Sequence, residues 1–170
     1  TAASHTPYFL SANHCISTQS AASSLQTYWF YRAGSCNSGA LSGANQTLTG
    51  GATLLYQSDS TDTSFMRLNS TPPGGTVFAA WSAGAPAVST STRGVHHPKG
   101  DLQKITVGNI GAYLSCVPNP GAGCTTAQVG QGNYLQIPYL SGITEGGSSG
   151  SGLFIISGAS HYLVGQLWGS

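Results

Sequence analysis

Residues 63–75 read Thr-Ser-Phe-Met-Arg-Leu-Asn-Ser-Thr-Pro-Pro-Gly-Gly and contain the two signals that decide the fold. The first six residues form a short β-rich run, and the adjacent prolines and glycines that follow stop strand pairing and free the path of the chain. Similar runs and turn signals alternate along the whole sequence. We therefore predict an all-β protein, a sandwich or barrel of antiparallel strands, with two lobes that meet at this boundary: residues 1–71 and residues 72–170.

The other predicted strands are short runs rich in β-branched, aromatic and aliphatic residues. Stretches of ten or more residues with apolar positions at helical spacing are always interrupted by Gly, Pro or Ser clusters, so the pattern favours strands over helices. The runs are residues 7–12, 25–32, 52–57, 76–81, 103–107, 134–137, 153–156 and 162–168.

The composition limits the classes of function. A chain of 170 residues with 39% hydrophobic residues has enough apolar material for the core of one domain or two small lobes. Only 5% of the residues are charged, against about 25% in typical domains. With a net charge of +1 there is no basic field for a nucleic-acid backbone, and no apolar run approaches the roughly 18 residues of a membrane span. We expect neither nucleic acid nor a membrane as a partner.

The four cysteines lack the spacing of a metal site. Cys116 and Cys124 enclose a Pro- and Gly-rich segment that can bring their thiols together, so we predict a disulfide between them, with free buried thiols as the alternative. A second bridge between Cys15 and Cys36 is also open. Disulfides together with a Ser-, Thr- and Gly-rich, weakly charged surface favour secretion into an oxidising compartment.

The residues from Thr144 to Gly152 form the most informative functional segment: Thr-Glu-Gly-Gly-Ser-Ser-Gly-Ser-Gly, followed directly by an apolar strand. A serine held between glycines can direct its hydroxyl and the adjacent backbone N–H groups to one point, as an acyl-transfer nucleophile requires. Ser149 is therefore the candidate nucleophile. The alternative is an ordinary Gly/Ser-rich hairpin loop.

A nucleophilic serine needs a base, and near neutral pH this is usually a histidine oriented by a carboxylate. His14 follows an apolar strand that ends in small residues and precedes Cys15, which makes it the candidate base. Of the four acidic residues, Asp62 stands at the entry to a predicted buried strand and is the candidate orienting acid. Asp59, three residues earlier, is the second choice. The alternative interpretations are a strand-end histidine and an aspartate that caps a turn.

The order His14, Asp62, Ser149 resembles that of the chymotrypsin-like serine proteases. Residues 11–15, Ser-Ala-Asn-His-Cys, resemble the family's small-Ala-small-His-Cys motif, and residues 147–151, Gly-Ser-Ser-Gly-Ser, resemble its Gly-Asp-Ser-Gly-Gly motif. Further landmarks look like the bacterial lysyl endopeptidase branch: Tyr8-Phe9-Leu10, Leu68-Asn69, Val95-His96-His97-Pro98, Thr144-Glu145 and Val164-Gly165-Gln166-Leu167.

The resemblance implies a fold of two antiparallel six-stranded β-barrels, here incomplete at both ends, and a secreted serine endopeptidase that needs no cofactor. His14 would be the general base, Asp62 its orienting acid and Ser149 the nucleophile that forms an acyl-enzyme with a protein or peptide substrate. The backbone N–H groups of Gly147 and Ser149 would form the oxyanion hole. The substrate-binding residues would be Thr144 and Glu145 on the pocket wall and Leu167, Trp168 and Gly169 on the strand beside the substrate.

The sequence departs from the lysyl endopeptidase branch at three positions of the site: Trp168 replaces a histidine, and Gly146 and Gly152 replace prolines. We expect the acid that binds lysine in that branch to lie beyond the segment that ends at Ser170, so a preference for lysine at P1 is one expectation among others. In the branch, the cysteines that match Cys15 and Cys36 pair with upstream residues. We accordingly expect further chain segments to complete the fold.

Two other classes of protein fit parts of the sequence. A secreted β-sandwich for carbohydrate binding or adhesion would suit the low charge, the three tryptophans and the eight tyrosines. An inactive protease homologue would keep the fold for binding alone. The adjacent histidines His96 and His97 suggest a metal ligand pair, but neighbouring strand residues point to opposite faces, so we predict no metal site.

Overall fold

A computed structural model describes residues 5–117 and 123–169 of the chain. Within these residues the protein is mostly β, with short strands and one short α-helix. The elements of the first part are β1 (Tyr8–Ala12), α1 (Gln19–Ser23), β2 (Thr27–Trp29), β3 (Gln46–Leu48), β4 (Ala52–Ser58) and β5 (Thr63–Leu68). Those of the second part are β6 (Ala80–Trp81), β7 (Ser91–His96), the 3-10 helix η1 (Pro98–Gly100), β8 (Lys104–Asn109), β9 (Ala112–Cys116), β10 (Cys124–Ala127), β11 (Tyr134–Gln136), β12 (Tyr139–Ser141), β13 (Gly152–Ser157) and β14 (Ser160–Gln166).

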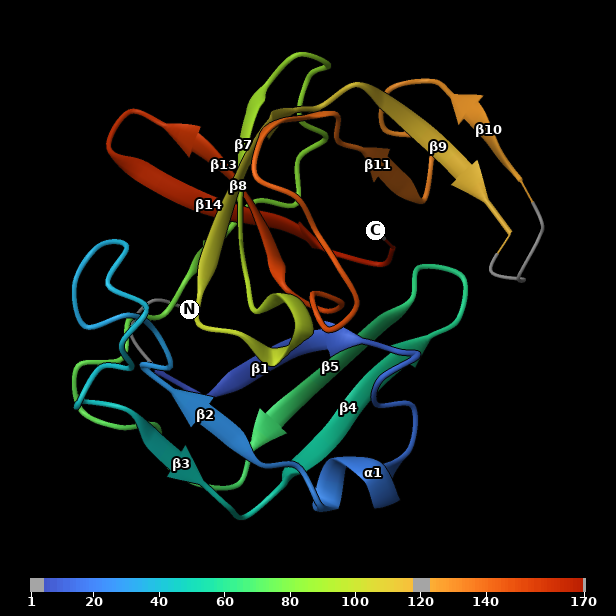
Figure 1. Cartoon of the computed structure of the whole chain (residues 1–170). Coiled ribbons are helices and arrows are strands. Elements are labelled where there is room, and N and C mark those ends of the chain that lie inside the picture. The colour runs from blue at the N-terminus through green and yellow to red at the C-terminus, as the bar shows by residue number, and fades with distance from the viewer. Residues whose placement is uncertain (1–4, 118–122, 170) are drawn as a thin grey trace.

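The strands pair within two groups. Figure 1 shows the first group in the lower part of the picture and the second group in the upper part. In the first group β5 lies between β1 and β4, and β2 pairs with β3. In the second group the order β12-β8-β7-β13-β14-β6 forms a six-stranded sheet, and β9 lies between β10 and β11. Among the described residues all four sheets are open, so the expected pair of closed six-stranded barrels is not formed. The pairing of β14 with β6 is parallel, whereas we predicted antiparallel strands throughout.

The core of the first group is built around β5, where the predicted and observed bounds agree. Alternate residues of this strand point inward, and Ser64, Met66 and Leu68 are buried. Met66 and Leu68 pack with Ala22 of α1 and Ala52 of β4. The period of two that a strand imposes on its side chains therefore places the apolar residues of β5 on one face.

Several predicted strands are shorter or shifted. The predicted runs 25–32 and 76–81 contain only the three residues of β2 and the two of β6. The sequence did not reveal β3, β7, β9, β10 and β12, nor the helix α1, whose N-cap Thr18 accepts a hydrogen bond from the Ala21 N–H group.

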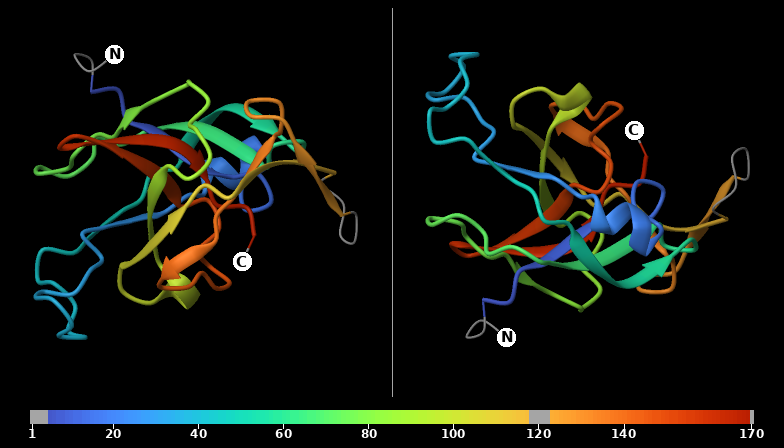
Figure 2. Two further views of the ribbon diagram at one scale, coloured as in Figure 1. Left: turned by 90° about the horizontal axis from the view of Figure 1, so that it is seen from above. Right: turned by 90° about the horizontal axis from the view of Figure 1, so that it is seen from below.

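Two peripheral segments project from opposite sides of the molecule, the loop of residues 30–45 and the hairpin β9–β10 (Figure 2). The predicted disulfide between Cys116 and Cys124 is present and joins the ends of β9 and β10. Cys15 and Cys36 are free thiols, so the bridge between them that the sequence left open is not formed. Among the described residues, no helix is long and apolar enough to cross a membrane.

Candidate active site

The structure places the Asp62 carboxylate directly on His14. Asp62 Oδ2 lies 2.7 Å from Nδ1 of His14, and Asp62 Oδ1 accepts the backbone N–H of the same residue at 2.8 Å. Asp62 is buried, with 4% of its surface exposed, whereas the side chain of His14 is 46% exposed. Two bonds to one residue fix both the position and the rotation of the carboxylate. The imidazole thus has one nitrogen held by a buried acid, and the other, Nε2, has no protein hydrogen-bond partner among the described residues.

Local backbone geometry explains why Asp62 points at His14. Its φ of +48° lies in the left-handed region, which aspartate tolerates better than most residues. The Asp62 carbonyl accepts bonds from the Asn13 N–H at 2.8 Å and from Gln166 Nε2 at 2.8 Å. Asp59, the second choice for the acid, instead accepts a bond from the Asn13 side-chain amide. The two aspartates therefore hold successive residues of the same turn, and only Asp62 contacts the imidazole.

The loop that carries Ser149 docks on the strand that presents His14. A Cβ atom added at Gly150 would lie 2.7 Å from Ser11 Oγ and 2.8 Å from the backbone nitrogen of Ala12, so only glycine allows this approach. On its other side, the Gly150 N–H donates to the Leu167 carbonyl at 2.8 Å. Ser149 is consequently held beside the end of β1, and this strand ends two residues before His14. Within the described residues its hydroxyl group forms no hydrogen bond to protein.

The two predicted oxyanion donors are unpaired. In the described part of the chain, the backbone N–H groups of Gly147 and Ser149 donate to no protein acceptor, while the N–H of Ser148 between them donates to the Glu145 carbonyl at 2.9 Å. Gly147 has a φ of +90°, which favours glycine. Two unpaired N–H groups so close together in a turn are free to accept an oxyanion as a ligand.

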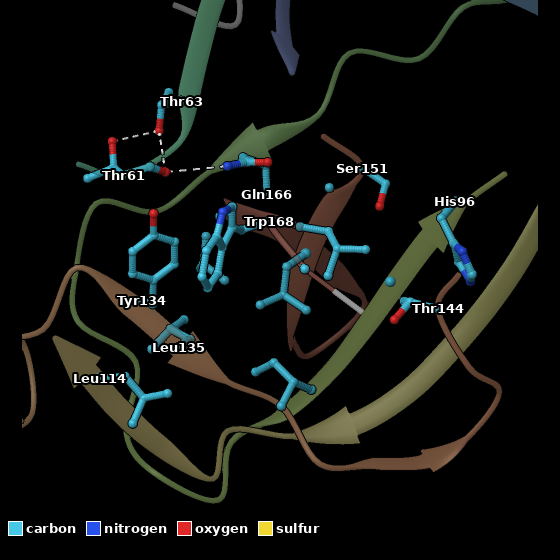
Figure 3. Close-up of a pocket in the computed structure, with 18 of the residues that line it drawn as sticks. Thr61, Thr63, His96, Leu114, Tyr134, Leu135, Thr144, Ser151, Gln166 and Trp168 are labelled. Atoms are coloured by element: carbon cyan, nitrogen blue, oxygen red, sulfur yellow. Dashed lines mark hydrogen bonds between the residues drawn. The ribbon is translucent and has the colours of Figure 1, made fainter. Parts of the chain in front are cut away.

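A cavity of about 660 Å³ opens next to this loop (Figure 3). Tyr134 and Trp168 lie side by side on one flank, with their ring centroids 4.8 Å apart, and His96, Thr144 and Ser151 lie on the other. The lining is mostly apolar, with hydroxyl groups between the apolar side chains, and no carboxylate lines it among the described residues. A cavity of this size accepts a large side chain or several residues of an extended peptide.

Four of the five predicted substrate-binding residues line this cavity: Thr144, Leu167, Trp168 and Gly169. Glu145 is not among the lining residues. Its carboxylate lies 2.6 Å from Lys99 Nζ, and this contact raises the pKa of Lys99. Both backbone groups of Leu167 bond to the serine loop. Its carbonyl accepts the Gly150 N–H, and its own N–H donates to the Ser151 carbonyl at 2.9 Å.

Sequence reasoning missed one pair at the site, His96 and Ser148. Nδ1 of His96 lies 2.8 Å from the Ser148 hydroxyl oxygen, and both residues are buried, with exposures of 2% and 1%. Burial, and secondarily the neighbouring His97, lowers the pKa of His96. The partners are 52 residues apart, and only the adjacency of Ser148 to the candidate nucleophile could have singled it out.

The neighbouring polar and titratable groups have separate partners. His97 turns outward, and its Nδ1 lies 3.0 Å from the Asp101 carbonyl, so the two adjacent histidines do not share a ligand position. In the described part of the chain no three residues among His, Cys, Asp and Glu gather as metal ligands would. Desolvation, followed by the Asp62 carboxylate, raises the pKa of Cys15, which keeps this nearby thiol protonated and a weak nucleophile.

These features define a mostly β protein in which a carboxylate-held histidine lies beside a glycine-flanked serine loop. The family model for the C-terminal domain of lysyl endopeptidase matches residues 1–170, and the chain belongs to that family. It is 39% identical over 165 residues to lysyl endopeptidase of Pseudomonas aeruginosa, a match that covers 95% of this chain and 33% of that protein. The chain thus spans about a third of the length of this relative.

Proposed function

We propose that the chain is the peptidase region of a secreted serine endopeptidase with His14, Asp62 and Ser149 as its triad. The observation that carries the proposal is the pair of bonds from one buried carboxylate to Nδ1 and to the backbone of His14. This arrangement orients an imidazole as a general base and stabilises the imidazolium that forms when the base accepts a proton. The docking of Gly150 on β1 supports Ser149 as the group that gives up that proton.

The proposed reaction proceeds in two steps, acylation of the serine and hydrolysis of the acyl-enzyme. Ser149 Oγ attacks the carbonyl carbon of the scissile peptide while its proton passes to His14 Nε2, and the proton then goes to the leaving amine as the C–N bond breaks. Water, deprotonated by His14, next attacks the acyl carbon, and the proton passes from His14 to Ser149 Oγ as the bond between the acyl carbon and Oγ breaks. The unpaired N–H groups of Gly147 and Ser149 bind the oxyanion in both steps.

The cavity supports a peptide substrate. In the described residues, the backbone groups of Trp168 and Gly169 have no protein partner and continue the line of β14 along the cavity, so they can pair with an extended chain. Thr144 supplies a hydroxyl group on the wall. A preference for lysine at P1 rests on the name of the Pseudomonas relative, since in the described residues no carboxylate lines the cavity. Cleavage-site profiling on a denatured protein mixture tests this preference.

The finer fold and the location are part of the same proposal. We propose that residues 1–71 and 72–170 are the two lobes of a chymotrypsin-type fold, because β1 to β5 pair only with one another and β6 to β14 do likewise. Further chain segments would extend the open sheets toward barrels. The Cys116–Cys124 disulfide supports secretion, since disulfides persist in oxidising compartments.

A fluorophosphonate probe tests the function, because it phosphonylates a serine only when a base activates that serine. The full-length protein should be labelled once per molecule, at Ser149, and the His14→Ala variant should not be labelled. Ser157→Ala serves as the control, because Ser157 is an exposed residue at the end of β13. A folded protein that leaves Ser149 unlabelled would be an inactive homologue or a binding module, and the proposal would be wrong.

A further inference from the structure

The loop that carries Ser149 contacts β1 through Gly150. Its preceding residues contact a second segment, residues 96–99 at the junction of β7 and η1. Three contacts join these two segments. His96 Nδ1 lies 2.8 Å from Ser148 Oγ, the Lys99 N–H donates to the Gly146 carbonyl at 2.7 Å, and Lys99 Nζ lies 2.6 Å from Glu145. The three contacts lie on Glu145, Gly146 and Ser148, within four residues of the loop.

The contact to the Gly146 carbonyl acts on an oxyanion donor. Gly146 C=O and Gly147 N–H belong to one planar trans peptide unit, in which the two groups point in opposite directions. A carbonyl fixed by the Lys99 N–H therefore turns the Gly147 N–H away from η1. Lys99 has a left-handed φ of +52°, and a Cβ added at Gly147 would lie 3.2 Å from its backbone nitrogen, so the two backbones are closely packed.

The contact to Ser148 acts on the other donor. The Ser148 hydroxyl oxygen accepts the Glu145 N–H at 3.3 Å, so its own proton can go to Nδ1 of His96. His96 is then neutral, with its proton on Nε2, a buried atom that has no hydrogen-bond partner among the described residues. Ser148 precedes the peptide unit whose N–H belongs to Ser149. A side chain locked on both sides keeps that unit from rotating.

The magnitudes identify His96 as the residue to test. The ion pair between Lys99 and Glu145 is largely exposed, with the Lys99 side chain 73% accessible, and such pairs contribute little. The bond between His96 and Ser148 is buried, and the loss of a partner for a buried polar group has a larger effect. The backbone contact at Lys99 is preserved by any side-chain replacement other than proline.

We propose that His96 is a positioning residue for the oxyanion hole, holding Ser148 so that the N–H groups of Gly147 and Ser149 converge on the substrate carbonyl. This inference rests on the proposed peptidase function. The inference predicts a specific effect on catalysis. Replacement of His96 should weaken the stabilisation of the transition-state oxyanion, whereas binding of the substrate in its ground state should be retained.

The test compares His96→Leu with His96→Asn in the full-length protein. Leucine removes the bond, whereas the asparagine amide can place a polar atom near the position of Nδ1. With a peptide ester substrate, kcat of His96→Leu should fall about 30-fold, and KM should stay nearly unchanged. A fall of this size lies between the effect of a small displacement of the donors and the larger effect of losing one oxyanion donor. His96→Asn should recover most of this loss. The affinity for a peptide aldehyde inhibitor, which mimics the oxyanion, should fall in parallel with kcat/KM.

His97→Leu is the matched control, because this adjacent half-buried histidine bonds to the Asp101 carbonyl and not to the serine loop. Ser148→Ala removes the same buried bond from the loop side, and its loss should not add to that of His96→Leu, since residues that share one interaction are not additive. Wild-type kcat in folded His96→Leu, or fully additive losses in the double variant, would overturn the inference. If the wild-type protein neither cleaves the ester nor reacts with the fluorophosphonate, the proposed function itself is wrong.

Discussion

Replacement of Asp62 by asparagine tests the triad most directly, because the structure dictates how the new amide must orient. The backbone N–H of His14 can only donate, so it will keep an oxygen as its partner. The amide NH₂ group then takes the place of Oδ2 and donates to Nδ1 of His14. This forces the proton of the imidazole onto Nε2, the nitrogen that must accept the proton of Ser149.

The expected loss follows from this change of tautomer. A histidine with the wrong tautomer has no free lone pair for the serine proton, and the equivalent change in a serine protease triad lowers kcat about 10⁴-fold. This corresponds to about 5.4 kcal/mol of activation free energy. Stability should change far less, by about 1–3 kcal/mol, because both hydrogen bonds are retained and only their charge assistance is lost.

The assay is the pre-steady-state burst with a chromogenic peptide ester, which isolates acylation from the later hydrolysis. Asp59→Asn is the control, because the Asp59 carboxylate bonds to the Asn13 side chain, and an asparagine carbonyl can still accept that bond. Its acylation rate should stay within about tenfold of the wild type, since no group that faces the substrate changes. Equal losses in the Asp59 and Asp62 variants would refute the assignment of the acid, as would an Asp62→Asn protein with a normal burst.

Three further outcomes are expected for stability. Met66→Ala should lower the free energy of unfolding by about 2–5 kcal/mol in urea titrations, because Met66 is fully buried, whereas Leu55→Ala, at a 47% exposed position, should cost under about 1 kcal/mol. Replacement of Cys116 and Cys124 by serine should cost about 2.6 kcal/mol for a loop of this length, and an unchanged urea midpoint would contradict it. The lowered pKa of His96 means that unfolding takes up a proton at acidic pH, so stability should fall as pH drops below about 6.5, and less steeply in His96→Asn.

The three strands β1, β4 and β5 could be predicted from the sequence because their patterns are local. The β-rich run of residues 63–68 predicted β5, and Asp62 just before it was the predicted partner of His14, which its carboxylate contacts. The Pro- and Gly-rich boundary at 72–75 lies between β5 and β6, as expected of residues that interrupt pairing.

The missed features either depend on partners distant in the sequence or are too short to show a period. The strand β7 contains arginine, glycine and histidine and has little β-rich character of its own, but it is held between β8 and β13. The helix α1 is five residues long, too short for a helical period to be visible. The pair of His96 and Ser148 joins the end of β7 to the serine loop, and single-sequence patterns carry no information about such contacts.

The side chain of Gln166 has a consequence for engineering. Its amide, at the end of β14, donates a hydrogen bond to the carbonyl of Asp62, the residue just before β5, and two residues later Trp168 lines the cavity. Under the proposed function, a redesign of this strand that alters specificity would therefore shift the backbone of Asp62 as well. Libraries that randomise Trp168 and Gly169 should keep Gln166 fixed, so that altered selectivity can be selected without an accompanying loss of turnover.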